Sequence, residues 1–268
     1  MTFNFRTLFA KDDSRAVRGV PAGYRVYAIG DVHGRFDLLE ECLGRVEDDM
    51  AEREPAQNII VFLGDLVDRG PSSAQVVEYL RNYSRPGVRT VFLIGNHEEV
   101  LLRLLRGESK FLGDWLRFGG AECARSYGID PGLFKRMLSE QGLALLREKI
   151  PQSHQSFLAS LVDTVRIGGY LFVHAGVRPG VPLSEQSQTD LRWIREPFLH
   201  DSTDHGFVVV HGHTIAEQVD VCDNRIGIDT GAYRTGILTA LALEGAERWF
   251  LQTARSGAKL PNSPEMAR

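Results

Sequence analysis

Short apolar runs alternate with amphipathic segments along the first hundred residues of the chain. Runs at 24–29, 58–63 and 88–94 are rich in β-branched residues and lead into glycine-bearing polar loops, which predicts buried strands. Between these runs, apolar residues recur at helical spacing over 36–50 and 72–83. This alternation predicts an α/β fold in which helices cover the faces of a sheet.

The pattern becomes largely helical over residues 98–163, where glycine and proline break the helices into short segments. We interpret 107–150 as a helical cap over a ligand crevice, with packed scaffold helices as the alternative. Strands are predicted to resume afterwards, at 161–167, 170–173, 207–210, 218–228 and 236–250. The C-terminal part is therefore expected to be all-β.

The two ends of the chain differ from the part between them. Residues 1–23 mix phenylalanine with charged side chains, and we expect an N-terminal arm that either docks on an apolar patch or stays mobile. Residues 253–268 carry Ser, Pro, Gly and Lys, and we expect a disordered tail. One catalytic domain is expected over 24–252.

Composition restricts the class of protein. With 43% hydrophobic and 25% charged residues, the chain has the balance of a globular enzyme, which we expect to be soluble and cytoplasmic. A net charge of −4 gives no basic field, so neither nucleic acid nor a membrane is an expected partner. No apolar segment is long enough to span a bilayer and no signal peptide is recognisable. Cys42, Cys123 and Cys222 lack Cys-x-x-Cys spacing, which predicts reduced, buried thiols.

Polar residues collect in the loops that follow the predicted strands. They are Asp31, His33, Asp65, Asp68, Arg69, Asn96, His97, His174 and His213. Open α/β sheets place their ligand sites at the carboxyl ends of strands, so these side chains are expected to meet. Carboxylate, imidazole and amide donors without cysteine suit divalent metals such as manganese, iron or zinc.

These residues fall in five motifs, which are, in chain order, Gly30-Asp31-Val32-His33-Gly34, Gly64 to Gly70, Gly95-Asn96-His97-Glu98, His174-Ala175-Gly176 and Gly212-His213-Thr214. The ordered set resembles the signature of the phosphoprotein phosphatase family of calcineurin-like metallophosphoesterases. The resemblance covers about residues 25 to 245 and is greatest to short bacterial and phage-type serine/threonine protein phosphatases. It implies a two-sheet β-sandwich flanked by helices.

The resemblance also implies two divalent metal ions, manganese first, that share one carboxylate and activate a bridging hydroxide for direct attack on phosphorus. It places the first metal on Asp31, His33 and Asp65. It places the second on Asp65, Asn96, His174 and His213.

The same resemblance assigns the remaining site residues to the phosphoryl group and the leaving group. His97 is similar to the general acid of the family, and Asp68 to the partner that orients and charges it. Arg69 resembles one phosphate clamp. Arg195, in Trp193-Ile194-Arg195, resembles the second, with an ordinary surface arginine as the alternative.

Three further residues near these motifs have open roles. His211 is either an additional donor behind the metal site or a contact with the crevice wall. Asp229 is left out of the site because Asp-Thr-Gly also forms a plain Asx turn, and Tyr233 is a similar case.

Two enzyme activities and one non-enzymatic function fit these motifs. The leading expectation is hydrolysis of phosphoserine and phosphothreonine on a protein or peptide, with phosphotyrosine left open. A diadenosine tetraphosphate hydrolase is the alternative, because such enzymes are similar at the first three motifs, while Glu98 and Gly212-His213-Thr214 favour the protein phosphatases. A binding module without catalysis is disfavoured by the complete set of site residues. The sequence leaves the oligomeric state open.

Overall fold

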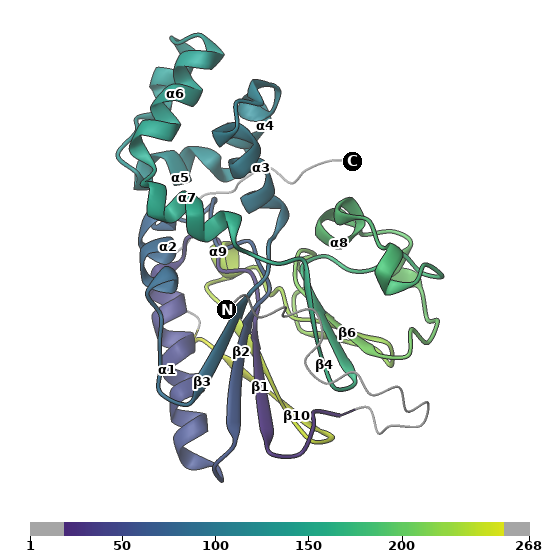
Figure 1. The fold of residues 1–268 in the computed structure, drawn as a ribbon. Helices are drawn as coiled ribbons and strands as arrows, with labels where there is room; N and C mark the ends of the chain where they lie inside the picture. Colours follow the sequence, from purple (N-terminus) through teal and green to yellow (C-terminus); the bar gives the residue numbers. More distant parts are fainter. Residues whose placement is uncertain (1–18, 255–268) are drawn as a thin grey trace, which may run out of the picture.

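The computed structural model describes residues 19–254, and its centre is a pair of five-stranded sheets (Figure 1). The first sheet has the order β10-β9-β1-β2-β3 and the second the order β4-β5-β6-β8-β7. The strands of the first sheet are β1 (Tyr24–Ile29), β2 (Gln57–Phe62), β3 (Val88–Phe92), β9 (Thr239–Glu244) and β10 (Glu247–Gln252). Those of the second are β4 (Thr164–Ile167), β5 (Tyr170–Val173), β6 (Val208–His211), β7 (Asp220–Val221) and β8 (Arg225–Gly227).

Parallel pairing brings the polar loops of the first sheet to one edge. β1 pairs with β2 and β2 with β3, all in parallel, so that Ile29 lies opposite Phe62 and Phe62 opposite Phe92. The three strands therefore end at the same level, and the loops that follow them start side by side. In the second sheet, β5, β6 and β8 are also parallel, which places the ends of β5 and β6 together.

The two sheets pack face to face. Their shared core contains Val26 and Val61 of the first sheet together with Phe172 and Val210 of the second, all fully buried. This arrangement confirms the predicted α/β class with a two-sheet sandwich.

The outer face of the first sheet is covered by helices. α1 (Phe36–Glu52) and α2 (Ser73–Arg81) contribute Leu39, Leu43 and Val77 to a core with Ile60 and Phe62. α3 (Asn96–Leu105) begins directly after the loop that follows β3. Each of these helices is amphipathic, as the spacing of its apolar residues predicts.

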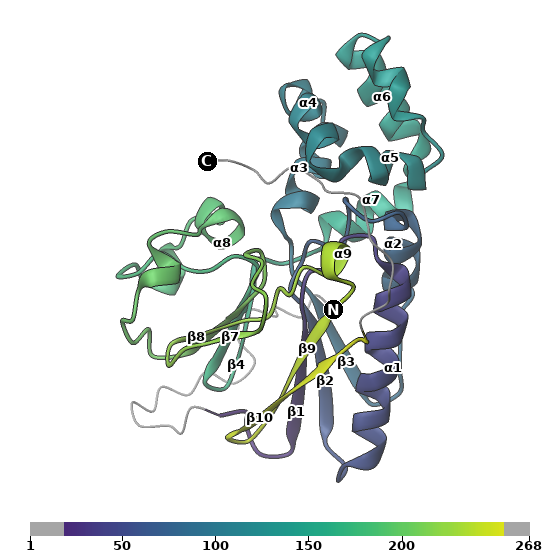
Figure 2. The same cartoon turned by 180° about the vertical axis from the view of Figure 1, so that it is seen from behind.

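The chain between β3 and β4 is largely helical, as predicted for 98–163. After α3 its elements are η1 (Ser109–Phe111), α4 (Leu112–Trp115), η2 (Leu116–Gly120), α5 (Ala121–Ser126), η3 (Pro131–Lys135), α6 (Ser139–Lys149) and α7 (Gln152–Ala159). α5 and α7 pack on α2, and α6 packs on α3. The helices extend beyond the edge at which β1, β2 and β3 end (Figures 1 and 2).

Four short helices complete the described elements, and one of them corrects the sequence analysis. They are η4 (Leu183–Glu185), α8 (Gln188–Trp193), η5 (Phe198–His200) and α9 (Ala232–Thr235). The C-terminal part is not all-β, because α9 interrupts it between β8 and β9. The turn begins and ends at Gly231 and Gly236, which both have left-handed backbone conformations.

The predicted arm and tail lie largely outside the described residues. Only residues 19–23 of the arm and 253–254 of the tail are described. Cys42 and Cys123 are buried free thiols as expected, whereas Cys222 is partly exposed. Within the described chain, none of the helices has both the length and the apolar character needed to cross a bilayer.

Candidate metal centre and active site

The loops that follow the strands have unusual backbone conformations. Within residues 19–254, a positive φ outside glycine occurs only at predicted site residues: His33, Asp65, Asp68, Arg69 and His213. A positive φ is unfavourable for a residue with a Cβ atom, and such strain persists where surrounding contacts fix a functional side chain. The loops therefore hold these five residues in positions that relaxed loops would not give them.

Two glycines of the motifs leave room for carboxylates. A Cβ atom on Gly95 would lie 2.1 Å from Oδ1 of Asp65, and a Cβ atom on Gly212 would lie 2.0 Å from Oδ1 of Asp31. Neither distance is possible for real atoms. Both glycines are therefore required so that each carboxylate can approach a neighbouring loop.

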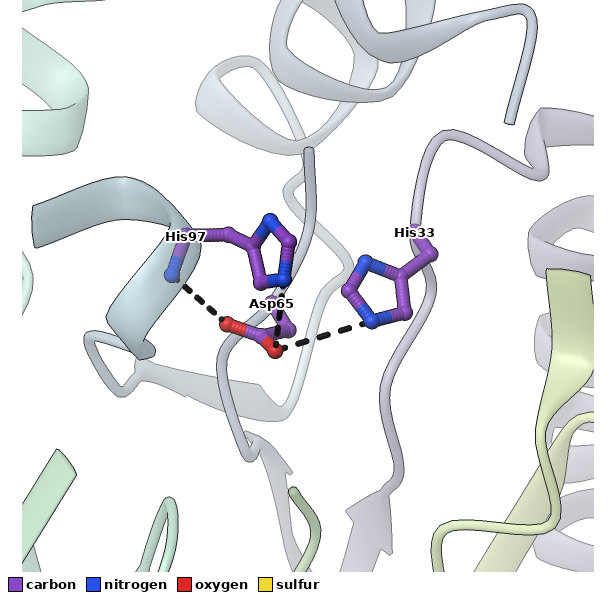
Figure 3. Close-up of side chains that lie close together, drawn as sticks. All are labelled: His33, Asp65 and His97. Atoms are coloured by element: carbon purple, nitrogen blue, oxygen red, sulfur yellow. Dashed lines mark hydrogen bonds and ion pairs between the residues drawn. The ribbon is translucent and has the colours of Figure 1, made fainter. Parts of the chain in front are cut away.

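Asp65 is at the centre of the site (Figure 3). Its Oδ2 lies 3.6 Å from Nε2 of His33 and 3.9 Å from Nε2 of His97. Its Oδ1 lies 3.4 Å from Nε2 of His174. Donor atoms of His33, Asp65 and His97 form one group within 4.8 Å, and those of Asp65, His174 and His213 form a second. One carboxylate thus belongs to two donor groups, as the predicted bridging ligand requires.

The second group shows unmatched lone pairs. Nδ1 of His174 is 2.8 Å from the carbonyl oxygen of Leu63, so in a neutral ring this nitrogen carries the proton and donates it. Nε2 of His174 then directs its lone pair at Oδ1 of Asn96, 3.0 Å away, and at Asp65. Nε2 of His213 is buried with no hydrogen-bond partner among the described residues. Converging acceptors of this kind fit a bound cation.

Burial favours the neutral form of the histidines that would bind metal. It lowers the pKa of His33, His174 and His213, and the charge of Arg69 lowers that of His33 further. Burial raises the pKa of Asp65, but the positive charge that His174, His97 and His33 carry when protonated lowers it more, so the carboxyl has a pKa below its usual range. Neutral imidazoles beside an ionised carboxylate are the protonation states in which these groups coordinate metals.

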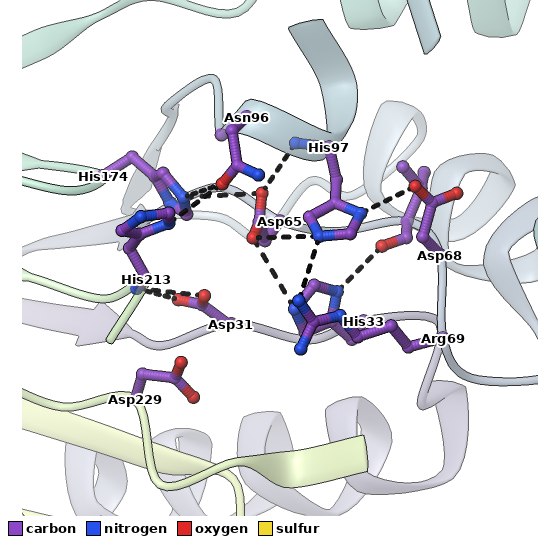
Figure 4. A network of polar contacts seen from close by, with 12 residues as sticks. Asp31, His33, Asp65, Asp68, Arg69, Asn96, His97, His174, His213 and Asp229 are labelled. Carbon is purple, nitrogen blue, oxygen red and sulfur yellow. Dashed lines mark hydrogen bonds and ion pairs between the residues drawn. The ribbon is translucent and has the colours of Figure 1, made fainter. Parts of the chain in front are cut away.

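Asp31 lies beside the backbone of His213 (Figure 4). Its Oδ2 accepts a hydrogen bond from the backbone N–H of His213 at 3.0 Å. Burial, together with the charges of Asp229 and Asp65, raises the pKa of Asp31 well above its usual value. Three carboxylates without a matching cation are unfavourable in a buried site, which is a second reason why a metal ion fits here.

His97 and Asp68 form a hydrogen-bonded pair. Nδ1 of His97 lies 2.7 Å from Oδ2 of Asp68, and Nε1–H of Trp115 donates to both Asp68 oxygens at 3.1 and 3.2 Å. Burial lowers the pKa of His97, but the Asp65 and Asp68 carboxylates raise it more, so it lies above the usual value. The pair is arranged to keep a proton on the imidazole, as a general acid requires.

Arg69 contacts the site directly, and Arg195 lies within electrostatic range of it. Nη2 of Arg69 lies 3.3 Å from Nε2 of His97, and its guanidinium lies over the ring of Tyr233 at 4.7 Å. Arg195 is exposed after α8, where burial of part of its side chain and the charge of Arg69 lower its pKa and the charge of Asp65 raises it. The structure therefore brings Arg195 within electrostatic range of the cluster.

Glu98 is a structural site residue whose role the sequence did not reveal. The fully buried carboxylate accepts four backbone N–H groups, from Asp65, Leu66, Val67 and Gly95, at 2.8 to 3.1 Å. It fixes the loop after β2 to the start of α3. The only signal in the sequence is its place three residues after Gly95, the spacing of a capping box.

The three residues whose roles the sequence left open occupy different places in the structure. Asp229 is buried close enough to Asp31 for its charge to raise the pKa of the Asp31 carboxyl, and Tyr233 contacts both Arg69 and the ring of His33, so both belong to the site although sequence analysis omitted them. His211 does not join the donor groups. Its ring packs edge-on against Phe198, with ring centroids 5.1 Å apart, which favours the contact with the crevice wall.

Comparisons with known proteins agree with this geometry. The profile of the family described as calcineurin-like phosphoesterase matches residues 24–235. A Bacillus thuringiensis protein named bis(5'-nucleosyl)-tetraphosphatase PrpE, asymmetrical, is 26% identical over 258 residues, which are 90% of this chain and 97% of that protein. A relative of the same name from Anoxybacillus flavithermus is 26% identical over 231 residues, or 80% of this chain and 88% of the relative.

Solved structures share the fold at lower sequence identity. One named as a candidate diadenosine tetraphosphatase has a TM-score of 0.60 and 22% identity, with 88% of this chain and 100% of that chain covered. The cold-active protein-tyrosine phosphatase of a psychrophilic Shewanella has a TM-score of 0.52 and 16% identity, with 94% and 92% covered. Proteins that share this fold are thus named for two different substrates. Similarity to these solved structures is therefore evidence for the fold alone.

Proposed function

The chain belongs to the calcineurin-like phosphoesterase family, and we propose that it hydrolyses the phosphoric anhydride chain of a dinucleoside tetraphosphate. The observation that carries this proposal is the likeness to relatives named as tetraphosphatases, which extends over 90% of this chain and 97% of the Bacillus thuringiensis protein. It includes the helical part between β3 and β4, which packs beside the site. The alternative activity from the sequence thereby replaces the leading one.

The two donor groups around Asp65 suit two divalent metal ions, for which manganese is our first choice. The first group contains His97 and not Asp31, but His97 is paired with Asp68, so we assign Asp31 to that ion in its place. Asp31, His33 and Asp65 would hold one ion. The residues that would hold the other are Asp65, Asn96, His174 and His213. When bound, such ions supply positive charge at the reacting phosphoryl group. They also lower the pKa of bound water, so that hydroxide is available as a nucleophile near neutral pH.

The side chains around the metal site would handle the substrate. Arg69 and Arg195 would grip phosphoryl oxygens, for which planar guanidinium groups are suited. Tyr233, under the Arg69 guanidinium, would limit its rotation. His97, charged and oriented by Asp68, would donate a proton from Nε2 to the departing oxygen. An anhydride leaves as a phosphate, a weak base, so this proton matters less than for an alkoxide.

Hydrolysis of phosphoserine and phosphothreonine stays as the second candidate, and one observation favours it. The His97–Asp68 hydrogen bond of 2.7 Å, with a raised His97 pKa, suits the protonation of an alkoxide, which is a poor leaving group. The phosphorylated protein or peptide would then be the partner.

Turnover by metal-stripped protein refilled with manganese tests the proposal. The substrates are diadenosine tetraphosphate and peptides that carry phosphoserine, phosphothreonine or phosphotyrosine. We expect the dinucleotide to give the highest kcat/KM, and only with metal. A higher kcat/KM on a phosphopeptide would reject the proposal in favour of the second candidate.

A further inference from the structure

A cavity of about 430 Å³ opens beside the acid pair. It lies between α3, the η1–α4–η2 segment and α8, and its lining residues come from these places and from Asp68 in the loop after β2. Asp68, Asn96 and His97 of the active site are among the residues that line it. The volume falls within the roughly 300–1,000 Å³ of sites that enclose small organic ligands, and it is more than a phosphate group needs.

Four of the twelve residues that line the cavity are Phe or Trp. Phe111, Trp115 and Phe118 come from the helical part after α3, and Trp193 comes from α8. These four rings are separated by as many as 82 positions in the sequence. Flat aromatic surfaces that converge on one space favour a flat, weakly polar occupant, since stacking on them is favourable.

The aromatic walls are held by polar contacts. Nε1–H of Trp193 donates to Oε2 of Glu99 at 3.0 Å, and Nε1–H of Trp115 donates to Asp68. Arg103 lies over the ring of Phe111 at 4.2 Å. The ring faces therefore have defined positions before any ligand binds, which reduces the entropy lost on binding.

The charges in the cavity do not favour a phosphate chain. The Glu99 carboxylate lies 3.3 Å from Arg103 and 3.5 Å from Arg192, so these ion pairs satisfy the cations near the walls. Asp114, also in the lining, adds a negative charge. Phosphates are expected at Arg69 and Arg195 instead, and the aromatic cavity is left for an uncharged group.

We propose that this cavity binds the base and ribose of the nucleotide that leaves, an inference that rests on the proposed function. His97 lines the cavity and in the proposed function donates the proton to the departing oxygen, so the group attached to that oxygen would extend into the cavity. In a dinucleoside tetraphosphate that group ends in a nucleoside. Trp193 and Phe111 are then specificity-determining residues, because they contact the part of the substrate that does not react.

Calorimetric titration with two product-like probes tests the cavity without catalysis. Adenosine 5'-monophosphate carries the base, and ribose 5-phosphate lacks it. We expect the first to bind the manganese-loaded protein about 10- to 100-fold more tightly, because stacking of a base on aromatic rings contributes that much. In Trp193→Ala this difference should shrink to about threefold or less, with ribose 5-phosphate binding unchanged.

Two further variants separate stacking from structural damage. Trp193→Phe keeps a ring and loses only the hydrogen bond to Glu99, so it should keep most of the difference between the probes. Trp249→Ala removes an equally large side chain from β10, outside the cavity lining, and should keep all of it. An unchanged difference in Trp193→Ala would overturn the inference.

Kinetics on diadenosine tetraphosphate and inorganic tetraphosphate distinguish the two proposals. If the wild type cleaves the dinucleotide and Trp193→Ala raises KM about 10-fold on it alone, both proposals are supported. An unchanged KM would overturn the cavity assignment and leave the proposed function intact. If the dinucleotide is not cleaved, the proposed function fails, whatever the titrations show. If Trp193→Ala then impairs only a phosphotyrosine peptide, the occupant is an aryl group and the nucleoside assignment fails as well.

Discussion

The metal-binding loops and the aromatic cavity lie next to each other but are built differently. The loops carry short, buried, polar side chains fixed by backbone hydrogen bonds and by strained φ angles. The cavity carries long aromatic side chains that are mostly only partly buried and come from helices between and after the strands. The metal-binding loops suit a reaction that many phosphate esters and anhydrides share. The aromatic cavity suits discrimination among such substrates.

This difference predicts two kinds of mutational effect. Changes in the loops should impair every substrate, because they act on the reacting phosphoryl group. Changes in the cavity should alter the ratio between substrates, because they act on the group attached to it. The following variants test that division.

Asp65→Asn should have the largest effect. The amide keeps the size of the side chain but removes the negative charge shared by both donor groups, so both metal sites should weaken. We expect kcat/KM to fall by at least about 10³-fold on every substrate, since each metal contributes several kcal/mol. Metal content by mass spectrometry should fall in parallel. Asp48→Asn, an exposed position on α1, is the matched control. Full metal content in Asp65→Asn would contradict the bridging role.

Variants of Glu98 and Glu99 allow the two regions to be compared at neighbouring positions of one helix. Glu98→Gln replaces an acceptor of four backbone N–H groups by an amide that presents its own N–H groups to them. The free energy of unfolding should fall by about 2–4 kcal/mol. Glu99→Gln weakens partly exposed ion pairs and should cost about 1 kcal/mol or less. Thermal and urea unfolding of both variants measures this, and equal losses would mean that Glu98 does not fix the loop.

His97→Asn tests whether His97 is an acid or a ligand, since its Nε2 lies near Asp65. We expect metal content to stay unchanged while turnover falls by about 10²-fold or more on an alkyl phosphate. On an anhydride, whose leaving group needs a proton less, the loss should be about 10-fold. Loss of metal, or equal losses on both substrates, would contradict the role of general acid.

Tyr233→Ala should have the smallest effect of this set. It removes the ring beneath the Arg69 guanidinium, a contact of about 0.5–1 kcal/mol at a partly exposed site. KM should rise about two- to fivefold on all substrates with little change in kcat. Tyr233→Phe keeps the ring and should behave like the wild type. A KM increase in Tyr233→Phe as large as in Tyr233→Ala would show that the hydroxyl group acts instead of the ring.

The sequence predicts the loops well because their geometry demands particular residues at short spacing. Asp65 can occupy its position only if Gly95 is small, and each polar loop follows an apolar run that is recognisable as a strand. The pairing of glycines with acidic residues in the motifs is therefore a direct consequence of how closely the loops approach one another.

Other features depend on contacts between distant positions and could not be predicted. Glu98 and Glu99 are the same residue type side by side, and only the fold reveals that one faces the loop after β2 and the other faces Trp193. Asp229 resembles an ordinary turn residue until β8 brings it against Asp31. The cavity residues show no motif, because aromatic residues in helices usually indicate core packing.

A competition assay tests the central claim, that the loops perform the hydrolysis and the aromatic cavity selects a nucleotide. Manganese-loaded protein receives diadenosine tetraphosphate and a phosphoserine peptide in equal concentration, and the consumption of both is followed in one mixture. The wild type should consume the dinucleotide first, and Trp193→Ala should lose at least about tenfold of that preference. Consumption of the peptide first by both proteins would contradict the account.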